Sequence, residues 1–287
     1  MSTATATPTA IPTATASRLE LDLVRGRSGR TQLARVLQEF PQRVTVPMYL
    51  DLGDPGMAFL CVQNPTGGLF PGDHLSTAVA AGPGTSLHLT HQSATQVFAG
   101  DGSSRQSMRF DLTGDAFIEH FPKSVIPHAA SRHAQDTHVE VSDGSAYVGW
   151  EALAAGRIGH GERFAYGSYR ATTSIHHDGA LCARDVLDVT PGRADPRIAG
   201  LLGEYDYVAS MVVVAPAAAG SDLAAHLTEA LLALPDVTGA ASALPYDVGA
   251  SVRLLARHAP ALRRAQLALR AAARRRLQRC DELSGRL

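Results

Sequence analysis

Four acidic residues stand in sequence surroundings that suit metal chemistry. They lie inside or beside loop and strand patterns, whereas most other carboxylates fall in turns or at the ends of elements. A carboxylate binds a borderline divalent cation more weakly than imidazole or thiolate does, so a row of carboxylates suits transfer better than storage. We therefore predict that these residues line a path for a divalent cation: Asp73, Glu119, Glu151 and Glu162.

A simpler interpretation exists for each of the four residues taken alone. A buried carboxylate is commonly paired with an arginine, which satisfies its charge without any metal. The candidate partners are Arg157, Arg163 and Arg184. Both interpretations stay open at the level of the sequence.

The other residues with chemical potential form no catalytic pattern. Twelve histidines are present, but none belongs to a His-x-x-x-His or His-Glu-x-x-His pair, and a catalytic metal requires three converging ligands. His176 and His177 are adjacent, so on a strand their side chains point to opposite faces. Ser93 lacks the flanking glycines of a hydrolase nucleophile turn. The sequence thus gives no positive indication of catalysis.

A glycine-rich loop, Gly67-Gly68-Leu69-Phe70-Pro71-Gly72-Asp73, is a strong turn signal ahead of the strand pattern from Leu75 to Val79. Backbone N–H groups of such a loop can bind phosphate. A Walker-type loop also needs a Lys-Ser/Thr pair and a following helix, and neither is present. We therefore interpret the loop as a tight turn that brings Asp73 close to neighbouring strands.

Composition favours a soluble globular protein. The 287 residues are 45% hydrophobic and carry a net charge of −1, which offers no strong field for nucleic acid or an anionic membrane. The odd, widely spaced cysteines Cys61, Cys182 and Cys280 indicate a reducing compartment, the cytoplasm. No run of about 18 apolar residues predicts a membrane span. Residues 1–17 lack signal-peptide features and are predicted to be a disordered tail.

Strand patterns with a regular period dominate the chain from residue 18 to 215. Gly84, Gly114 and Gly144 are spaced 30 residues apart, and a strand pattern follows each of them. A fixed period of this length is typical of stacked supersecondary units. The sequence therefore predicts a mainly β fold, a layered or β-helical body of many short strands, with the three glycines at equivalent corners.

The period changes in residues 216–287, which we predict to be a helical C-terminal part of the same domain. Leu223, Leu227 and Leu231 recur at helical spacing, and a second helix is predicted from Ala261 to Arg279. Leu262 and Leu269 would pack this last helix onto the body. Its surface would carry seven arginines that meet an acidic protein partner rather than nucleic acid: Arg263, Arg264, Arg270, Arg274, Arg275, Arg276 and Arg279.

Five stretches, in this order and with compatible spacing, resemble the urease accessory protein family UreD, also called UreH. They are residues 67–73, 90–98, 118–122, 150–157 with 161–164, and Arg184-Asp185. The resemblance covers residues 18–215, with weaker likeness in the helical part.

The resemblance implies a non-catalytic scaffold of urease activation with a largely β fold. Such a protein binds the urease structural subunits, recruits UreF and through it UreG, and assists GTP-dependent insertion of nickel. It implies no tightly bound cofactor, only nickel in transit. Two alternatives stay open: a small cytoplasmic β-rich metallohydrolase that uses some of the histidines, and an adaptor with no direct metal role.

Overall fold

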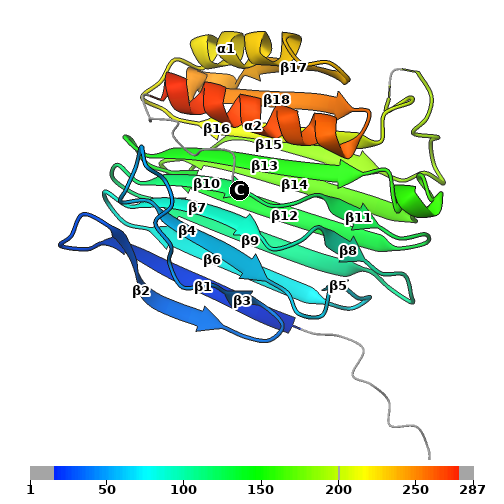
Figure 1. Cartoon of the computed structure of the whole chain (residues 1–287), viewed down its shortest axis with the longest axis horizontal. Coiled ribbons are helices and arrows are strands. Elements are labelled where there is room, and N and C mark those ends of the chain that lie inside the picture. Colours follow the sequence, from blue (N-terminus) through cyan, green and yellow to red (C-terminus); the bar gives the residue numbers. More distant parts are fainter. Residues whose placement is uncertain (1–15, 200, 278–287) are drawn as a thin grey trace, which may run out of the picture.

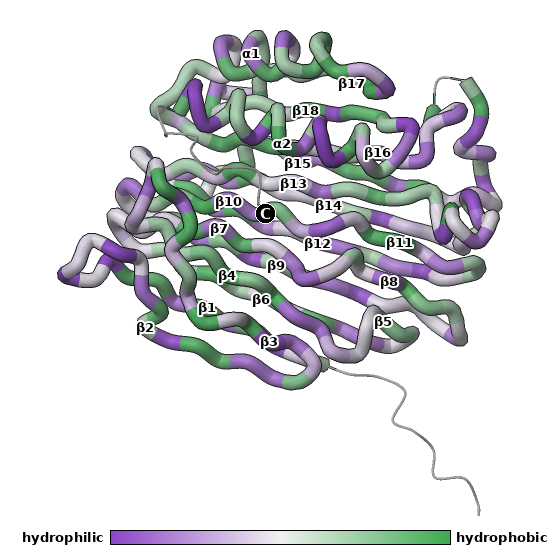
Figure 2. Tube along the Cα trace, viewed as in Figure 1, coloured by the Kyte–Doolittle hydropathy of each residue, from purple (hydrophilic) through white to green (hydrophobic). Residues whose placement is uncertain are grey.

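Two β-sheets lie face to face, and two helices pack on the outer face of the second sheet (Figure 1). The computed structural model describes residues 16–199 and 201–277. Hydrophobic and hydrophilic positions alternate along many of the strands (Figure 2). This period of two places one set of side chains between the sheets and the other set outside.

The first sheet has the strand order β15-β14-β12-β9-β6-β1-β2. Its five central strands run parallel to one another, and an antiparallel hairpin adds one strand at each edge. In β1 the alternation of the sequence buries Leu19, Leu21 and Leu23. The strands are β1 (Ala16–Arg25), β2 (Thr31–Gln38), β6 (His74–Ala81), β9 (Ser104–Leu112), β12 (Arg132–Val141), β14 (Ser168–His177) and β15 (Ala180–Val189).

The second sheet has the main strand order β17-β18-β16-β13-β10-β7-β4-β3. Three further short strands, β5, β8 and β11, pair in parallel with one another beside it. The strands are β3 (Arg43–Val44), β4 (Ala58–Gln63), β5 (Gly68–Leu69), β7 (Ser86–His91), β8 (Thr95–Val97), β10 (Phe117–Phe121), β11 (Val125–Pro127), β13 (Ala146–Ala154), β16 (Tyr207–Val214), β17 (Val237–Ala243) and β18 (Gly249–Ala256).

Successive coils of the chain build both sheets at once, which confirms the β-helical alternative. Each coil contributes a strand to the second sheet, a short strand, and a strand to the first sheet, as β7, β8 and β9 do. The turns after β6, β9 and β12 contain Gly84, Gly114 and Gly144, all with positive φ. Phe117 pairs with Ser86 on one side and Ala146 on the other, so the repeat is one residue longer than 30 in one coil and one shorter in the next.

Both predicted C-terminal helices are present, with two strands between them. Helix α1 (Gly220–Leu232) buries Leu223, Leu227 and Leu231, and helix α2 (Ala259–Arg276) begins slightly before its predicted start. Strands β17 and β18 occupy the stretch between the helices and extend the second sheet. The part after residue 215 is therefore a mixture of helix and strand, because the exposed edge of β16 accepts further strands.

Two of the three hydrophobic clusters in the described residues form successive layers of the fold. One lies between the sheets and includes Leu21, Leu60 and Phe110. The other joins α1 and α2 to the second sheet around Trp150 and Met211. Leu262 and Leu269 belong to this second layer, as their spacing predicts.

The N-terminal boundary differs from the prediction by two residues. Ala16 and Ser17 belong to β1, where Ser17 is 1% exposed, because they pair with the start of β6. The rest of the predicted tail, residues 1–15, lies outside the described residues. Of the helices in the described part, none is both long and apolar enough to cross a membrane.

A buried cluster of charges fastens α2 to the second sheet. The fully buried Glu119 carboxylate of β10 accepts hydrogen bonds from Arg270 Nε at 3.0 Å and Arg274 Nε at 2.6 Å. His88 Nδ1 of β7 lies 2.8 Å from the same carboxylate, and Arg274 also pairs with Asp51. Burial alone would raise the pKa of Glu119, but hydrogen bonds from His88 and Arg274 outweigh it and lower the pKa.

The prediction that all seven arginines of the last helix lie on its surface is therefore wrong for Arg270 and Arg274, which are 6% and 1% exposed. Residues four apart share one face of a helix. Here that face meets the buried carboxylate of Glu119. Arg279 lies outside the described residues.

We expect the substitution Gly114→Ala to destabilise the protein more than Gly179→Ala. Both glycines have positive φ, 64° and 81°, so each alanine costs about 1–2 kcal/mol of backbone strain. Only at Gly114 would the added Cβ lie 2.9 Å from Pro83 in the preceding turn, whereas nothing lies within 4 Å at Gly179. This contact adds about 1–3 kcal/mol of overpacking. Equal losses in urea unfolding would show that the stacked corners do not press on each other.

We expect Glu119→Gln to lower the free energy of unfolding by about 3–5 kcal/mol, because the amide leaves the buried Arg270 without its countercharge and leaves Arg274 with Asp51 alone. Glu39→Gln is the matched control, because Glu39 pairs with Arg18 at the exposed surface and contributes little. Urea unfolding measures both variants, and a small effect of Glu119→Gln would contradict the anchoring role of the cluster.

Candidate functional site

A row of three cavities runs between the two sheets. The outer cavity, of about 400 Å³, lies where β14 and β15 face β13, β16 and β18. The middle gap, of about 10 Å³, is bordered by His91, Lys123, Gln135 and Glu151 among others. The loop cavity, of about 40 Å³, lies under the glycine-rich loop. Neighbouring cavities share lining residues, so the three form one interrupted path.

Glu151 is the residue shared by the outer cavity and the middle gap. It lies on β13 and points toward the first sheet, where its Oε1 accepts hydrogen bonds from Thr137 Oγ1 at 2.9 Å, Gln135 Nε2 at 3.0 Å and Thr173 Oγ1 at 3.2 Å. Burial raises the pKa of Glu151, and these three neutral donors only partly offset the shift. The carboxyl group is thus held in place without a cationic partner among these donors.

His91 is the residue at the other side of the middle gap. It lies at the end of β7 and lines both the middle gap and the loop cavity, together with Thr95 and Gln106. Burial lowers the pKa of His91 to about 4, so the ring is neutral at pH 7 and can act as a metal ligand. The sequence prediction overlooked His91 among twelve histidines, although it lies in the stretch 90–98 that carries the resemblance.

The outer cavity contains one strong ion pair. Arg253 Nη2 of β18 lies 2.6 and 2.7 Å from the two carboxylate oxygens of Asp185 on β15. The pair bridges the two sheets beside Glu151, and the charge of Asp185 adds to the rise of the Glu151 pKa. Arg253 Nη1 is buried without a hydrogen-bond partner within the described residues. The mouth of the path is therefore polar and holds both signs of charge.

The glycine-rich loop closes the far end of the row. Gly68 on β5 pairs with Gln96 on β8 so closely that a Cβ at position 68 would lie 2.5 Å from the Gln96 carbonyl oxygen. Asp73 is buried and its Oδ2 accepts a hydrogen bond from the Phe70 N–H at 2.8 Å. Asp73 therefore stabilises the turn of the loop, and it is not among the residues that line the three cavities.

Glu119 and Glu162 are held by arginines, as the simpler interpretation of these carboxylates has it. Arg157 Nε donates to Glu162 Oε2 at 2.9 Å, and the Ala129 N–H donates to the same oxygen at 3.1 Å. The hydrogen bond from Arg157 lowers the pKa of Glu162 to about 2. Glu119 pairs with Arg270 and Arg274 of α2, which the sequence did not suggest as partners. The metal role of the four carboxylates stays a prediction, and Glu151 alone of them lines the row.

All five stretches that carry the family resemblance contribute to the row. Gly68 and Gln92 come from the first two stretches and Pro122 from the third. Glu151 belongs to the fourth stretch and Asp185 to the fifth. Segments far apart in the sequence thus meet along one line inside the molecule, because the coils stack in parallel register.

The arrangement suits weak, stepwise binding of a small cation. A neutral imidazole, a carboxylate and the side chain of Lys123 border a gap that has room for about one water molecule. One nitrogen and one oxygen ligand are too few to hold a divalent cation tightly, so a cation bound there can leave again. The row provides no set of three converging ligands of the kind used by catalytic zinc.

Comparisons with known proteins agree with this reading of the five stretches. A family model described as UreD urease accessory protein matches residues 15–286. The urease accessory protein UreD of Mycolicibacterium gilvum is 44% identical over 270 residues, which cover 93% of this chain and 96% of the relative. UreD 2 of Streptomyces griseus is 35% identical over 256 residues, 88% of this chain and 87% of the relative. UreD of Deinococcus radiodurans is 37% identical over 218 residues, which cover 74% of this chain and 76% of the relative. The chain therefore belongs to the UreD family of urease accessory proteins.

Proposed function

We propose that this chain is a non-catalytic scaffold of urease maturation. It binds the urease apoprotein together with UreF and UreG, and it assists GTP-dependent insertion of nickel into the urease active site. Membership of the UreD family supports the role in maturation. The sequence has no P-loop, so GTP hydrolysis is assigned to UreG.

We further propose that nickel crosses this chain along the row of cavities as cargo. The observation that carries this proposal is the position of Glu151, which borders two successive cavities without an arginine among its hydrogen-bond donors. Glu151 supplies an oxygen ligand and His91 a nitrogen ligand on the two sides of the middle gap. A nickel ion exchanging between them would gain and lose one ligand at a time, which keeps each step reversible.

We expect Glu151→Gln to lower the nickel content and activity of urease severalfold in cells grown at limiting nickel. The amide removes the charge that attracts the cation, but its carbonyl still accepts hydrogen bonds from Thr137 and Thr173, so folding and assembly should survive. The measurement is the nickel content of urease purified from cells that express each variant with all accessory proteins.

The matched control is Glu162→Gln, which removes the charge of a carboxylate held by Arg157 away from the cavities. It should load urease as the unsubstituted protein does. If Glu151→Gln also loads urease normally at limiting nickel, the path is wrong and the chain acts as an adaptor with no direct metal role.

Only the exposed arginines of α2 can contact a partner protein, because two of the predicted seven are buried. Arg264 and Arg275 are exposed, whereas Arg270 and Arg274 anchor the helix. Deleting the helix would therefore remove a part of the core, including Leu269, and could not isolate a binding effect.

We expect the double charge reversal Arg264→Glu/Arg275→Glu to weaken co-purification with UreF, because it repels an acidic partner. The melting temperature should change little, since both side chains reach solvent. A matched reversal of the exposed Arg35→Glu on β2, far from α2 in the fold, should leave UreF binding intact. Equal UreF recovery from all three proteins would remove α2 from the interface.

A further inference from the structure

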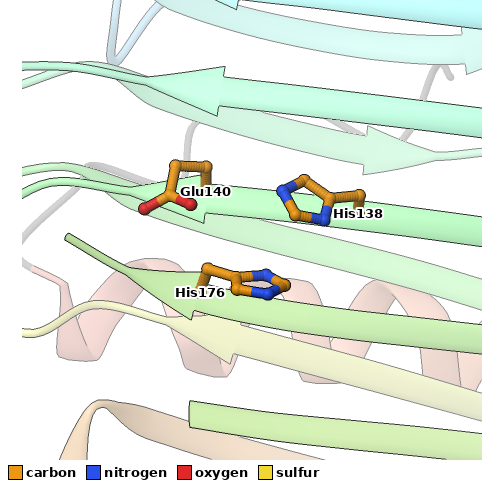
Figure 3. Close-up of side chains that lie close together, drawn as sticks. All are labelled: His138, Glu140 and His176. Atoms are coloured by element: carbon orange, nitrogen blue, oxygen red, sulfur yellow. The ribbon is translucent and has the colours of Figure 1, made fainter. Parts of the chain in front are cut away.

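A second group of potential metal ligands lies on the outer face of the first sheet, away from the row of cavities. It consists of His138 and Glu140 on β12 and His176 on β14, and one ligand atom from each residue lies within 4.8 Å of the others. Figure 3 shows the three side chains gathered at the two neighbouring strands. We call this group the outer triad.

Strand geometry alone explains why these residues meet. Side chains two apart on a strand point to the same face, so His138 and Glu140 both leave the sheet on its outer side, while Val139 is buried. The parallel register of β12 and β14 places Glu140 directly opposite His176. The ligand pattern is therefore His-x-Glu on one strand and a histidine on the next, a spacing that no helical metal motif contains.

The ligand atoms of the outer triad are largely free of competing bonds. His176 Nδ1 is buried without a hydrogen-bond partner, and the His138 ring makes no hydrogen bond within the described residues. The two ring centroids lie 4.3 Å apart with the planes tilted by 31°. Glu140 Oε1 accepts a hydrogen bond from the Gly179 N–H at 2.8 Å, which orients the carboxylate. Supporting bonds of this kind are typical of metal-binding carboxylates.

Arg109 on β9 is the neighbouring cationic side chain of the outer triad. It lies opposite His138 in the register, and its Nε and Nη2 donate to Asp111 at 2.7 and 2.6 Å. The charge of Asp111 therefore balances part of the positive charge beside the triad.

We propose that His138, Glu140 and His176 bind one divalent first-row cation of borderline softness, such as nickel or zinc. Two imidazoles and one carboxylate form a ligand set that such cations prefer, and water would complete the coordination. With metal–nitrogen bonds of about 2.1 Å, tetrahedral ligand atoms lie roughly 3.4 Å apart. The present ligand atoms lie within 4.8 Å of one another, so a bound cation would draw them closer together. This site faces solvent on the opposite side of the first sheet and is separate from the proposed nickel path.

The test uses the untagged full chain, dialysed to equilibrium against nickel chloride and, separately, zinc chloride. The variants are His138→Gln, Glu140→Gln and His176→Gln, each checked for a native circular dichroism spectrum. We expect each variant to bind one equivalent fewer than the unsubstituted protein, or to bind that equivalent at least about tenfold more weakly. With cobalt chloride as the probe, the absorption bands of nitrogen-ligated Co²⁺ should be lost in both histidine variants.

A control variant keeps the result specific to the outer triad. His74→Gln alters an exposed histidine on β6 of the same sheet. This variant should retain the full equivalent. Unchanged binding in the His138→Gln and His176→Gln variants would overturn the site, as would loss of the equivalent in His74→Gln. Normal metal binding by Glu151→Gln separates this site from the path between the sheets.

Discussion

The ion pairs between Glu119 and the arginines of α2 fix the position of this helix on the second sheet, and the packing of the other layers depends on that position. Glu119 lies in the middle of the second sheet, where a lone carboxylate would be costly to bury. Arg270 and Arg274 supply the countercharge from the far end of the chain, and Asp51 balances the second guanidinium. The helix, the central strands and the loop before β4 are thus tied at one point. Removing Glu119 leaves Arg270 unpaired inside the protein, and removing Arg274 leaves Asp51 without this partner, so the cluster favours a single arrangement of the layers.

The second constraint is the stacking of coils. Each coil crosses from one sheet to the other, so residues separated by a whole coil become neighbours across 4.7–4.9 Å of strand spacing, which is a general property of β-sheets. This geometry carries the glycine-rich loop, the segment with His91, and the strand with Glu151 to the same interior line. The turns at Gly84, Gly114 and Gly144 keep the coils in register. An interrupted row of polar cavities can therefore form inside a fold whose sheets are otherwise packed with aliphatic residues.

Two carboxylates of the same type serve opposite purposes because their donors differ. Glu119 receives charged N–H donors, which stabilise its anion and close it to other cations. Glu151 receives hydroxyl and amide donors, which hold the carboxyl group in place but leave its charge to be balanced by another group. This difference is the physical basis for treating Glu119 as part of the scaffold and Glu151 as part of the path. It also explains why an amide is a structural disruption at one position and a clean removal of charge at the other.

The sequence by itself determined the fold class, the β-helical repeat and the family. The alternation of Leu19, Leu21 and Leu23 indicates a strand, and the regularly spaced glycines indicate corners, where the structure gives them positive φ. Both signals arise from local backbone geometry. The leucines of α1 at helical spacing are an equally local signal.

What the sequence could not settle was the partner of each carboxylate. Glu119 pairs with Arg270 and Arg274 more than a hundred residues away, and His91 and Glu151 line one gap only because the coils stack. The outer triad likewise depends on the register between β12 and β14. Such contacts are decided by strand register and helix docking, which depend on the packing of the whole chain.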